Sequence, residues 1–289
     1  CEEIKLVKIN TSWQYLKNDN SKESINLPVV IRETEKKDKI IIECNYLLSN
    51  RNTKSYLEVY TNQNINMEEL NKKRVFIIGL GGIGCEIINH LVGVGIKYFT
   101  ILDFDNVDST NLNRQYLYND CDISKSKVDV VEQKIKLKNP SAIVKSYNMF
   151  VKNYDEIENI IKKEHIDIVI CAADTPFLDI RIFILEACIS CKVPCIFGGV
   201  SILTGQYGPT FLNSKKMSLY LKKLNKIKKE VKCNNTNKSS FGPTNTIISA
   251  YMSIDIIMTL LNIRKSINSL NKIKTLNFIT RKDYEEERF

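Results

Sequence analysis

Residues 75–88 read VFIIGLGGIGCEII, and this stretch decides the fold. A short apolar run leads into a cluster of glycines, and the apolar residues after the cluster recur at helical spacing. A second apolar run, 98–103, ends in Asp103. Strand, glycine turn, helix, strand and acid in this order predict a nucleotide-binding half of a doubly wound sheet. The glycines of the turn are Gly79, Gly81, Gly82 and Gly84.

A glycine turn of this kind suits a phosphate group. Without side chains the backbone can approach the phosphate closely, and the following helix offers free N–H donors at its N-terminus. Asp103 is placed to accept hydrogen bonds from ribose hydroxyls. Glycines that only allow tight packing are the alternative interpretation.

The residues after Asp103 favour a triphosphate over a dinucleotide. Four polar side chains follow it closely: Asn111, Arg114, Gln115 and Lys127. A triphosphate needs paired cations, because its charge must be neutralised before a nucleophile attacks the α-phosphorus. We expect Arg114 and Lys127 to be exposed in an empty site. A solvated surface pair and a dehydrogenase are the alternatives.

Strands and helices alternate from residue 71 onward, which predicts an α/β fold with a doubly wound, mostly parallel, Rossmann-like sheet. The expected parallel strands are 74–79, 98–103, 143–148, 166–172 and 193–198. The helices between them are expected at 83–94, 124–138, 154–164 and 177–191. At one edge we expect two antiparallel strands and a packed helix, near 203–212, 273–280 and 244–262, respectively.

The first 49 residues differ from the rest. Short apolar runs, such as KIIIEC (39–44), are separated by polar turns, such as NDNSKES (18–24). This pattern predicts short strands. We therefore expect a small β-rich N-terminal extension at 1–49 and one large domain at 50–289.

The composition is that of a folded domain with 43% hydrophobic residues. No run of 18 apolar residues and no signal peptide are present, so we expect no membrane span and no secretion. Nine cysteines lie mostly within apolar runs, which fits a reducing cytoplasm. Cys171, Cys188 and Cys195 are expected to be buried. Cys188 and Cys191 have metal-like spacing but no second pair.

Much of the formal charge of +9 lies in one segment, 215–232, which holds eight lysines and one glutamate. Apolar residues recur there at helical spacing, which predicts an amphipathic helix with a solvated lysine face. A basic wall that attracts ATP or an acidic peptide is the alternative. No basic motif interleaved with aromatic residues is present, so we expect no nucleic-acid partner.

These motifs resemble those of the ThiF/MoeB-type adenylating enzymes, the superfamily that includes the ubiquitin-activating enzymes. The resemblance covers roughly residues 50–280. It depends on three segments: GLGGIG (79–84), DFDNVDSTNLNRQ (103–115) and DISKSKVDVVEQKIKLKNP (122–140). It implies ATP as the nucleotide, with the glycine turn at its phosphates, Asp103 at its ribose, and Asp105 within the same nucleotide site.

The resemblance also assigns the polar residues. The triphosphate would be contacted by Asn111, Arg114 and Gln115, and its α- or β-phosphate by Lys127. Asp174, in VICAADTPF (169–177), matches the acid that positions Mg²⁺. Because it follows an apolar run, it should stand at the carboxyl end of a parallel strand, where doubly wound sheets bind ligands. A helix N-cap before Pro176 is the alternative.

Two further segments, FGGVSILTGQYGPTF (197–211) and SSFGPTNTIISAYMSIDIIMTLL (239–261), are similar to the microcin C biosynthesis branch of this superfamily. Enzymes of that branch adenylate the C-terminal residue of a small peptide. This similarity implies a precursor peptide as substrate, ATP with Mg²⁺, and a homodimer. It also places a peptide-gripping module of winged-helix type ahead of the adenylating domain, so the extension at 1–49 is expected to be part of such a peptide clamp, with a small ordered extension as the alternative. Activation of a ubiquitin-like sulfur carrier and a catalytically inactive peptide-binding scaffold are the alternatives.

Three features depart from the family pattern. The family usually carries two zinc-binding Cys-x-x-Cys pairs, and neither is found, so we expect no zinc site. An arginine that reaches the partner subunit's ATP site is replaced by Lys54, with Arg51 three residues earlier. A lysine neutralises charge but cannot fork onto two oxygens. No thioester cysteine is assigned, because Cys233 is the only cysteine between 212 and 240.

Overall fold

The computed structural model describes residues 69–230, 240–280 and 289 in full, together with the backbone of 67–68, of 282–288 and of five short N-terminal strands. The chain divides into two units, 1–65 and 66–289. This division falls later than the boundary between 49 and 50 that the sequence suggested. Each unit is described by itself.

The N-terminal unit contains only strands among its described residues. β1 (Lys5–Ile9), β2 (Ser12–Leu16) and β3 (Lys22–Ser24) form an antiparallel sheet. β4 (Ile31–Lys36) and β5 (Lys39–Cys44) form a separate antiparallel pair. The expected strands in the apolar runs at KLVKI and KIIIEC are thus confirmed, whereas β3 lies within NDNSKES, which was expected to be a turn.

The larger unit is built on one eight-stranded sheet in the order β13-β12-β11-β10-β9-β6-β7-β8. Five neighbouring strands run parallel. They are β6 (Arg74–Ile78), β7 (Tyr98–Asp103), β8 (Ile143–Asn148), β9 (Ile168–Cys171) and β10 (Cys195–Val200). The chain runs outward from β6 to β8 and then crosses back to β9, so the strand order reverses between β6 and β9. Doubly wound sheets bind ligands at such a switch point.

The other edge of the sheet is antiparallel. β11 (Thr204–Phe211), β12 (Lys272–Asn277) and β13 (Lys282–Arg288) follow β10 in that order. Two of these strands were expected from the sequence. The third, β13, has the sequence KDYEEER, which lacks the apolar alternation by which a strand is recognised.

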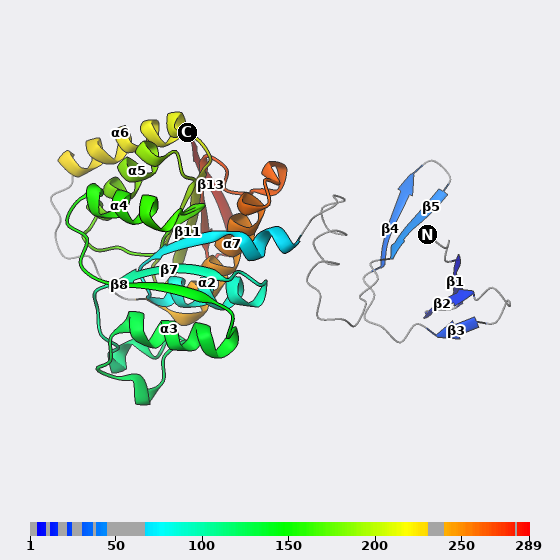
Figure 1. Cartoon of the computed structure of the whole chain (residues 1–289). Coiled ribbons are helices and arrows are strands. Elements are labelled where there is room, and N and C mark those ends of the chain that lie inside the picture. Colours follow the sequence, from blue (N-terminus) through cyan, green and yellow to red (C-terminus); the bar gives the residue numbers. More distant parts are fainter. Residues whose placement is uncertain are drawn as a thin grey trace. The chain divides into compact units, whose positions relative to one another are not determined.

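Helices cover both faces of the sheet (Figure 1). On one face lie α2 (Gly82–Gly93), α3 (Lys127–Lys138) and α7 (Gly242–Leu260). On the other lie α4 (Tyr154–Glu164), α5 (Asp179–Cys191) and α6 (Ser214–Glu230). The expected doubly wound α/β architecture is thus confirmed. α7 has 19 residues, yet no helix in the described part of the chain is long and apolar enough to cross a membrane.

β9 is apolar along its whole length, as is typical of a central strand whose two faces are both covered by helices. All four residues of β9, IVIC, are buried. The expected burial of Cys171, Cys188 and Cys195 is confirmed. This rigid layer fixes the positions at which the loops leave the sheet.

α6 is the amphipathic helix that the lysine-rich segment predicts. Met217, Tyr220 and Leu224 are buried and join the core beside α5, where Tyr220 packs against the Phe197 ring. Most of the lysines of the helix are exposed. The lysine-rich face is therefore a solvated face of the main domain.

Candidate functional site

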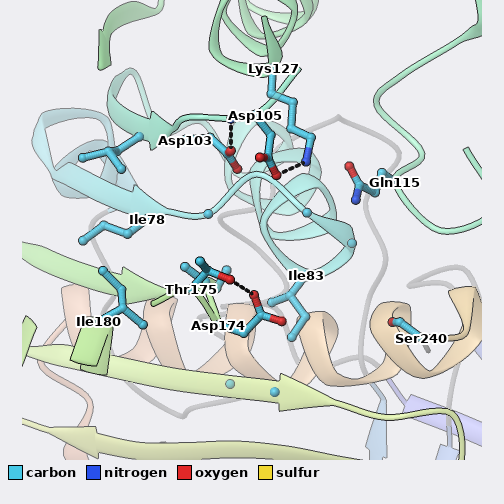
Figure 2. Close-up of a pocket in the computed structure, with 18 of the residues that line it drawn as sticks. Ile78, Ile83, Asp103, Asp105, Gln115, Lys127, Asp174, Thr175, Ile180 and Ser240 are labelled. Carbon is cyan, nitrogen blue, oxygen red and sulfur yellow. Dashed lines mark hydrogen bonds and ion pairs between the residues drawn. The ribbon is translucent and has the colours of Figure 1, made fainter. Parts of the chain in front are cut away.

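A cavity of about 710 Å³ opens at the carboxyl ends of the parallel strands. It is lined by all the predicted site residues that the structure describes: Gly79, Gly81, Gly82, Asp103, Asp105, Asn111, Arg114, Gln115, Lys127 and Asp174. Figure 2 shows Asp103, Asp105 and Lys127 on one side of this cavity and Asp174 with Thr175 on the other. The fold thus brings together residues from several separate segments.

The glycine turn leaves no space for side chains. Gly79 has a φ of +95°, and a Cβ at this position would lie 2.7 Å from the backbone of Ala172. A Cβ on Gly84 would lie 2.0 Å from the carbonyl oxygen of Gly79. Both positions therefore require glycine, which lets β6 turn directly into α2.

The N-terminus of α2 borders the cavity. Gly81 is the N-cap and has no side chain to occupy the first N–H groups of the helix. These groups have no partner within a helix. Gly81, Gly82 and Ile83 all line the cavity. The helix terminus therefore presents donors and the positive end of its dipole to an anion, as a phosphate-binding turn requires.

Asp103 is buried and braces the glycine turn. Its Oδ2 accepts a hydrogen bond from the Leu80 N–H at 2.6 Å, and its Oδ1 accepts one from the Asp105 N–H at 2.9 Å. Burial raises the pKa of the Asp103 carboxyl, whereas nearby Lys127 and these two bonds act to lower it. Each carboxylate oxygen has a second lone pair, so a ribose contact fits beside this bracing role.

Lys127 is held differently from our expectation. It is the first residue of α3, and its side chain is only 6% exposed. Its Nζ lies 3.1 Å from Oδ2 of Asp105, whose side chain is 49% exposed. The expectation that Lys127 is exposed in the empty site is therefore wrong, and so is the alternative of a solvated surface pair. The physical reason is that the apolar lysine stem is buried while the carboxylate pairs with its charge.

Asn111 ends a short 3-10 turn after β7, and Arg114 follows three residues later, half-buried rather than exposed as expected. Oδ1 of Asn111 accepts a hydrogen bond from the Asp108 N–H at 3.2 Å, which leaves its NH₂ group for a ligand. Nη1 of Arg114 donates to the Thr110 carbonyl at 2.8 Å and to Oδ1 of Asn113 at 2.9 Å. These contacts hold the guanidinium while its remaining N–H groups stay available. Both residues can thus supply donors to phosphate oxygens.

Gln115 brings an unsatisfied acceptor to the cavity. It is buried, and its Oε1 has no hydrogen-bond partner among the described residues. An unsatisfied buried polar atom costs about 1–3 kcal/mol. A ligand with hydroxyl or amino donors would satisfy it, and ATP carries both.

Asp174 follows β9 and is exposed at the carboxyl end of this parallel strand, as the sequence predicts. Its Oδ1 accepts a hydrogen bond from the Thr175 hydroxyl at 3.2 Å. α5 begins at Asp179, and its N-cap is Leu178. The alternative that Asp174 caps this helix is therefore wrong.

A carboxylate of the cavity fits a metal ion that binds together with substrate phosphates. Within the described ranges, no group of three or more His, Cys, Asp or Glu side chains could hold a metal ion. Mg²⁺ is usually bound by one or two carboxylates together with substrate phosphates. Asp174 offers one such carboxylate in the same cavity as the glycine turn. The absence of zinc stays a prediction.

Sequence reasoning missed several residues that line the cavity, among them Arg181, Ser240 and Asn245. Nδ2 of Asn245 donates to the Ser240 hydroxyl at 2.8 Å and to the Phe241 carbonyl at 2.7 Å. Its Oδ1 lies 2.4 Å from the position that a Cβ on Gly82 would occupy. Asn245 thus joins α7 to the N-terminus of α2. Its segment, FGPTNT, carried a resemblance but no sign of this contact.

Part of the cavity wall is apolar, formed by Phe104, Met149 and Val151 among others. Phe104 packs edge-to-face on Phe150, with ring centroids 5.0 Å apart. A wall of this kind suits a flat purine base. Three residues named in the sequence lie outside the described residues: Arg51, Lys54 and Cys233.

The fold and the cavity define a doubly wound α/β protein with a nucleotide-type site at its switch point. A model of the ThiF family matches residues 54–288, and the chain belongs to this family. The resemblance that the motifs carried is thereby confirmed.

Two curated relatives illustrate the family. The molybdopterin-synthase adenylyltransferase of Escherichia coli (strain K12) is 32% identical over 139 residues, which cover 48% of this chain and 54% of the relative. A probable molybdopterin-synthase adenylyltransferase of Gracilaria tenuistipitata var. liui is 32% identical over 203 residues, covering 68% and 53%, respectively. The chain therefore spans about half the length of these relatives.

Solved structures share the fold. The crystal structure of E. coli MccB with ATP aligns with a TM-score of 0.70 at 22% identity, covering 83% of this chain and 73% of that chain. Microcin C7 biosynthetic enzyme MccB in complex with N-formylated MccA aligns with a TM-score of 0.69 at 21% identity, covering 84% and 73%. The Rossmann-like fold expected from the sequence is thus shown.

Proposed function

We propose that this chain is an ATP- and Mg²⁺-dependent adenylyltransferase that activates the C-terminal carboxylate of a small ribosomal peptide as an acyl-adenylate. One observation carries the proposal. The glycine turn with its helix N-terminus, the cations Lys127 and Arg114, and the carboxylate Asp174 all line one cavity. A triphosphate needs such a combination, whereas a dinucleotide cofactor does not.

The reaction joins a carboxylate oxygen of the peptide to the α-phosphorus of ATP. The bond from this phosphorus to the pyrophosphate oxygen breaks, and pyrophosphate leaves with the electron pair. No general base is needed, because a carboxyl group with a pKa of about 3.5 is already ionised at neutral pH.

The protein contributes positioning and charge to this step. Lys127 and Arg114 stabilise the negative charge that develops on the phosphates. The first N–H groups of α2 hold phosphate oxygens in place. Asp174 would hold Mg²⁺, which neutralises charge on the departing pyrophosphate.

The peptide substrate is supported by the structural likeness to MccB, which has been solved with ATP and with N-formylated MccA. Curated relatives named as molybdopterin-synthase adenylyltransferases favour a second candidate, activation of a ubiquitin-like sulfur carrier. Both candidates share the adenylation step and differ in the carboxylate that is activated.

ATP–pyrophosphate exchange tests the proposal. Exchange should depend on Mg²⁺ and on an added peptide with a free C-terminal carboxylate, and a peptide amide of the same sequence is the matched control. Asp174→Asn should remove the exchange. Exchange with a sulfur-carrier protein but with no peptide from a C-terminally varied library would favour the second candidate. Binding of NAD without binding of ATP would contradict both.

A further inference from the structure

Arg181 is a cation of the cavity to which the steps above give no role. It lies in the first turn of α5 and lines the cavity with Asp174. Its Nη2 donates to the Gly198 carbonyl at 2.7 Å, and its guanidinium carbon lies 5.6 Å from the centre of the Phe197 ring. The side chain also interacts with the Tyr220 hydroxyl, so it is held in place by a carbonyl, a hydroxyl and an aromatic face.

No carboxylate of the described residues forms an ion pair with Arg181, although the side chain is half-buried. Lys127, the other sheltered cation of the cavity, does have such a partner in Asp105. A charge removed from water is costly unless an opposite charge compensates for it. One carbonyl, the Phe197 ring and the Tyr220 hydroxyl satisfy only part of a guanidinium that has five donors. Arg181 is thus poised for an anion that enters the cavity.

The strand order places Arg181 on the opposite side of the glycine turn from Lys127. The glycine turn follows β6, and Asp105 and Lys127 follow β7, its neighbour on one side. Arg181 stands by β9 and β10 on the other side, where it bonds to Gly198. A nucleotide with its phosphates between the glycine turn and Asp174 leaves the β10 end of the cavity, where Arg181 bonds to Gly198, to the second substrate.

The backbone beside Arg181 is free of side chains. Gly198 and Gly199 end β10 and line the cavity. A Cβ on Gly199 would lie 3.3 Å from Nη2 of Arg181, so a larger residue would press on the guanidinium. Gly199 therefore leaves space beside the guanidinium, whereas a Cβ on Gly198 would point toward Met252.

We infer that Arg181 binds the carboxylate of the substrate that is adenylated. The inference rests on the proposed function and names the residue that holds its second substrate. One carboxylate oxygen accepts hydrogen bonds from the guanidinium, and the other attacks the α-phosphorus while pyrophosphate leaves. In the acyl-adenylate the first oxygen remains as the acyl carbonyl oxygen and still accepts from Arg181. Such charge-assisted bonds are stronger than neutral ones.

The test compares three probes by calorimetry: a non-hydrolysable ATP analogue, AMP, and 5′-O-(N-acetylalanylsulfamoyl)adenosine. The last compound mimics an acyl-adenylate with a peptide-like end, and AMP shares its nucleoside but lacks the acyl group. Arg181→Gln should bind the acyl compound at least about tenfold more weakly than the wild type. Its affinities for AMP and for the ATP analogue should change less than about twofold.

Two further variants complete the design. Arg181→Lys keeps the positive charge but loses the forked guanidinium, so its loss of affinity for the acyl compound should be intermediate. If the glutamine variant does not fold, the lysine variant is used for the test instead. Arg74→Gln is the matched control, because Arg74 also stacks on a ring, 4.3 Å from the Tyr98 centroid, at the amino end of β6. It should bind all three probes as the wild type does.

The outcomes separate this inference from the proposed function. Wild-type protein that binds neither ATP analogue nor acyl compound would overturn the proposed function and the inference with it. Wild-type protein that binds both, paired with an Arg181→Gln variant that keeps its affinity for the acyl compound, would overturn the inference alone. An equal loss for all three probes would also overturn it, because Arg181 would then serve the nucleotide or the fold.

Discussion

At the scale of single residues, Lys127 contributes both to the charge of the cavity and to the stability of the fold. Its charge faces the cavity, and its pairing with Asp105 lies at the start of α3. The backbone N–H of Lys127 also donates to the Asp105 carbonyl at 3.1 Å. The residue that we expect to act on the phosphates therefore also joins α3 to the loop after β7.

We predict that Lys127→Ala lowers both activity and stability. Pyrophosphate exchange should fall about 10²–10³-fold, the usual cost of one pre-organised transition-state contact. The free energy of unfolding should fall by about 1–3 kcal/mol, because Asp103 and Asp105 lose a sheltered counter-charge, although Asp105 is half-exposed. Urea denaturation measures the second effect.

Two variants serve as controls for Lys127→Ala. Lys125 pairs with Asp122, but its side chain is 57% exposed, so Lys125→Ala should change stability by no more than about 0.5 kcal/mol. Arg114 is bonded on an exposed turn, so Arg114→Ala should lose exchange activity while its stability stays near that of the wild type. A stable Lys127→Ala protein would show that the ion pair with Asp105 contributes nothing to the fold.

At the scale of secondary structure, the junction of β6 and α2 sets the position of the phosphate site. Gly79 turns the chain at a positive φ, and Gly84 packs one turn of α2 directly against it. Oδ2 of Asp103 holds the Leu80 N–H between them. The junction is thus braced by the end of the neighbouring strand, β7.

We predict opposite effects for two Gly→Ala changes within α2. At Gly84 the new Cβ would overlap the Gly79 carbonyl oxygen at 2.0 Å, so the free energy of unfolding should fall by about 3 kcal/mol or more. At Gly93 no atom lies within 4 Å of the new Cβ, so the same change should stabilise the protein by up to about 1 kcal/mol. Chemical denaturation compares the two variants.

The affinity of Gly84→Ala and Gly93→Ala for the ATP analogue distinguishes an effect on the phosphate site from an effect on stability alone. Gly84→Ala should weaken binding, because its strain falls on the turn that receives the phosphates, and Gly93→Ala should leave binding unchanged. If Gly84→Ala were as stable as the wild type and bound the analogue equally well, the turn would not be the tightly packed junction described above.

At the scale of the whole molecule, we predict a homodimer in which Lys54 or Arg51 completes the ATP site of the partner. A symmetric interface would complete both sites equally. The phosphates carry several negative charges, and a cation from outside the subunit would supplement Arg114 and Lys127. Sedimentation or light scattering reports the oligomeric state.

Subunit mixing tests the exchange of cations. An inactive Arg114→Ala chain mixed with an inactive Arg51→Ala/Lys54→Ala chain forms some dimers with one unimpaired site. Up to about half the activity of a wild-type dimer should return in that species. The control mixes Arg114→Ala with Lys127→Ala, which leaves a defect in every site and should restore nothing. If subunits exchange and the first mixture stays inactive, neither cation acts across the interface.

The sequence by itself determined most elements of the main domain, though not β13, and it identified ten of the residues that line the cavity. Apolar runs and helical periodicity report burial, and here burial follows the sheet layers, so β7 and α4 have the bounds that were predicted. The edge strand β8 also has its predicted bounds, although none of its residues is buried. The sequence alone likewise reveals glycines that need a positive φ or close packing, and polar residues at strand ends. The turn and Asp174 could therefore be placed.

Only the tertiary structure decided which side chains meet. The burial of Lys127 depends on Asp105, and Arg181 meets Gly198 only because β9 and β10 are neighbours. Asn245 reaches the cavity because α7 packs on α2, and β13 joins the sheet by pairing with β12 despite its charged sequence. Periodicity records the burial of each residue but not its partners. The charge balance of the cavity arises from such pairings, so it can be determined only from the tertiary structure.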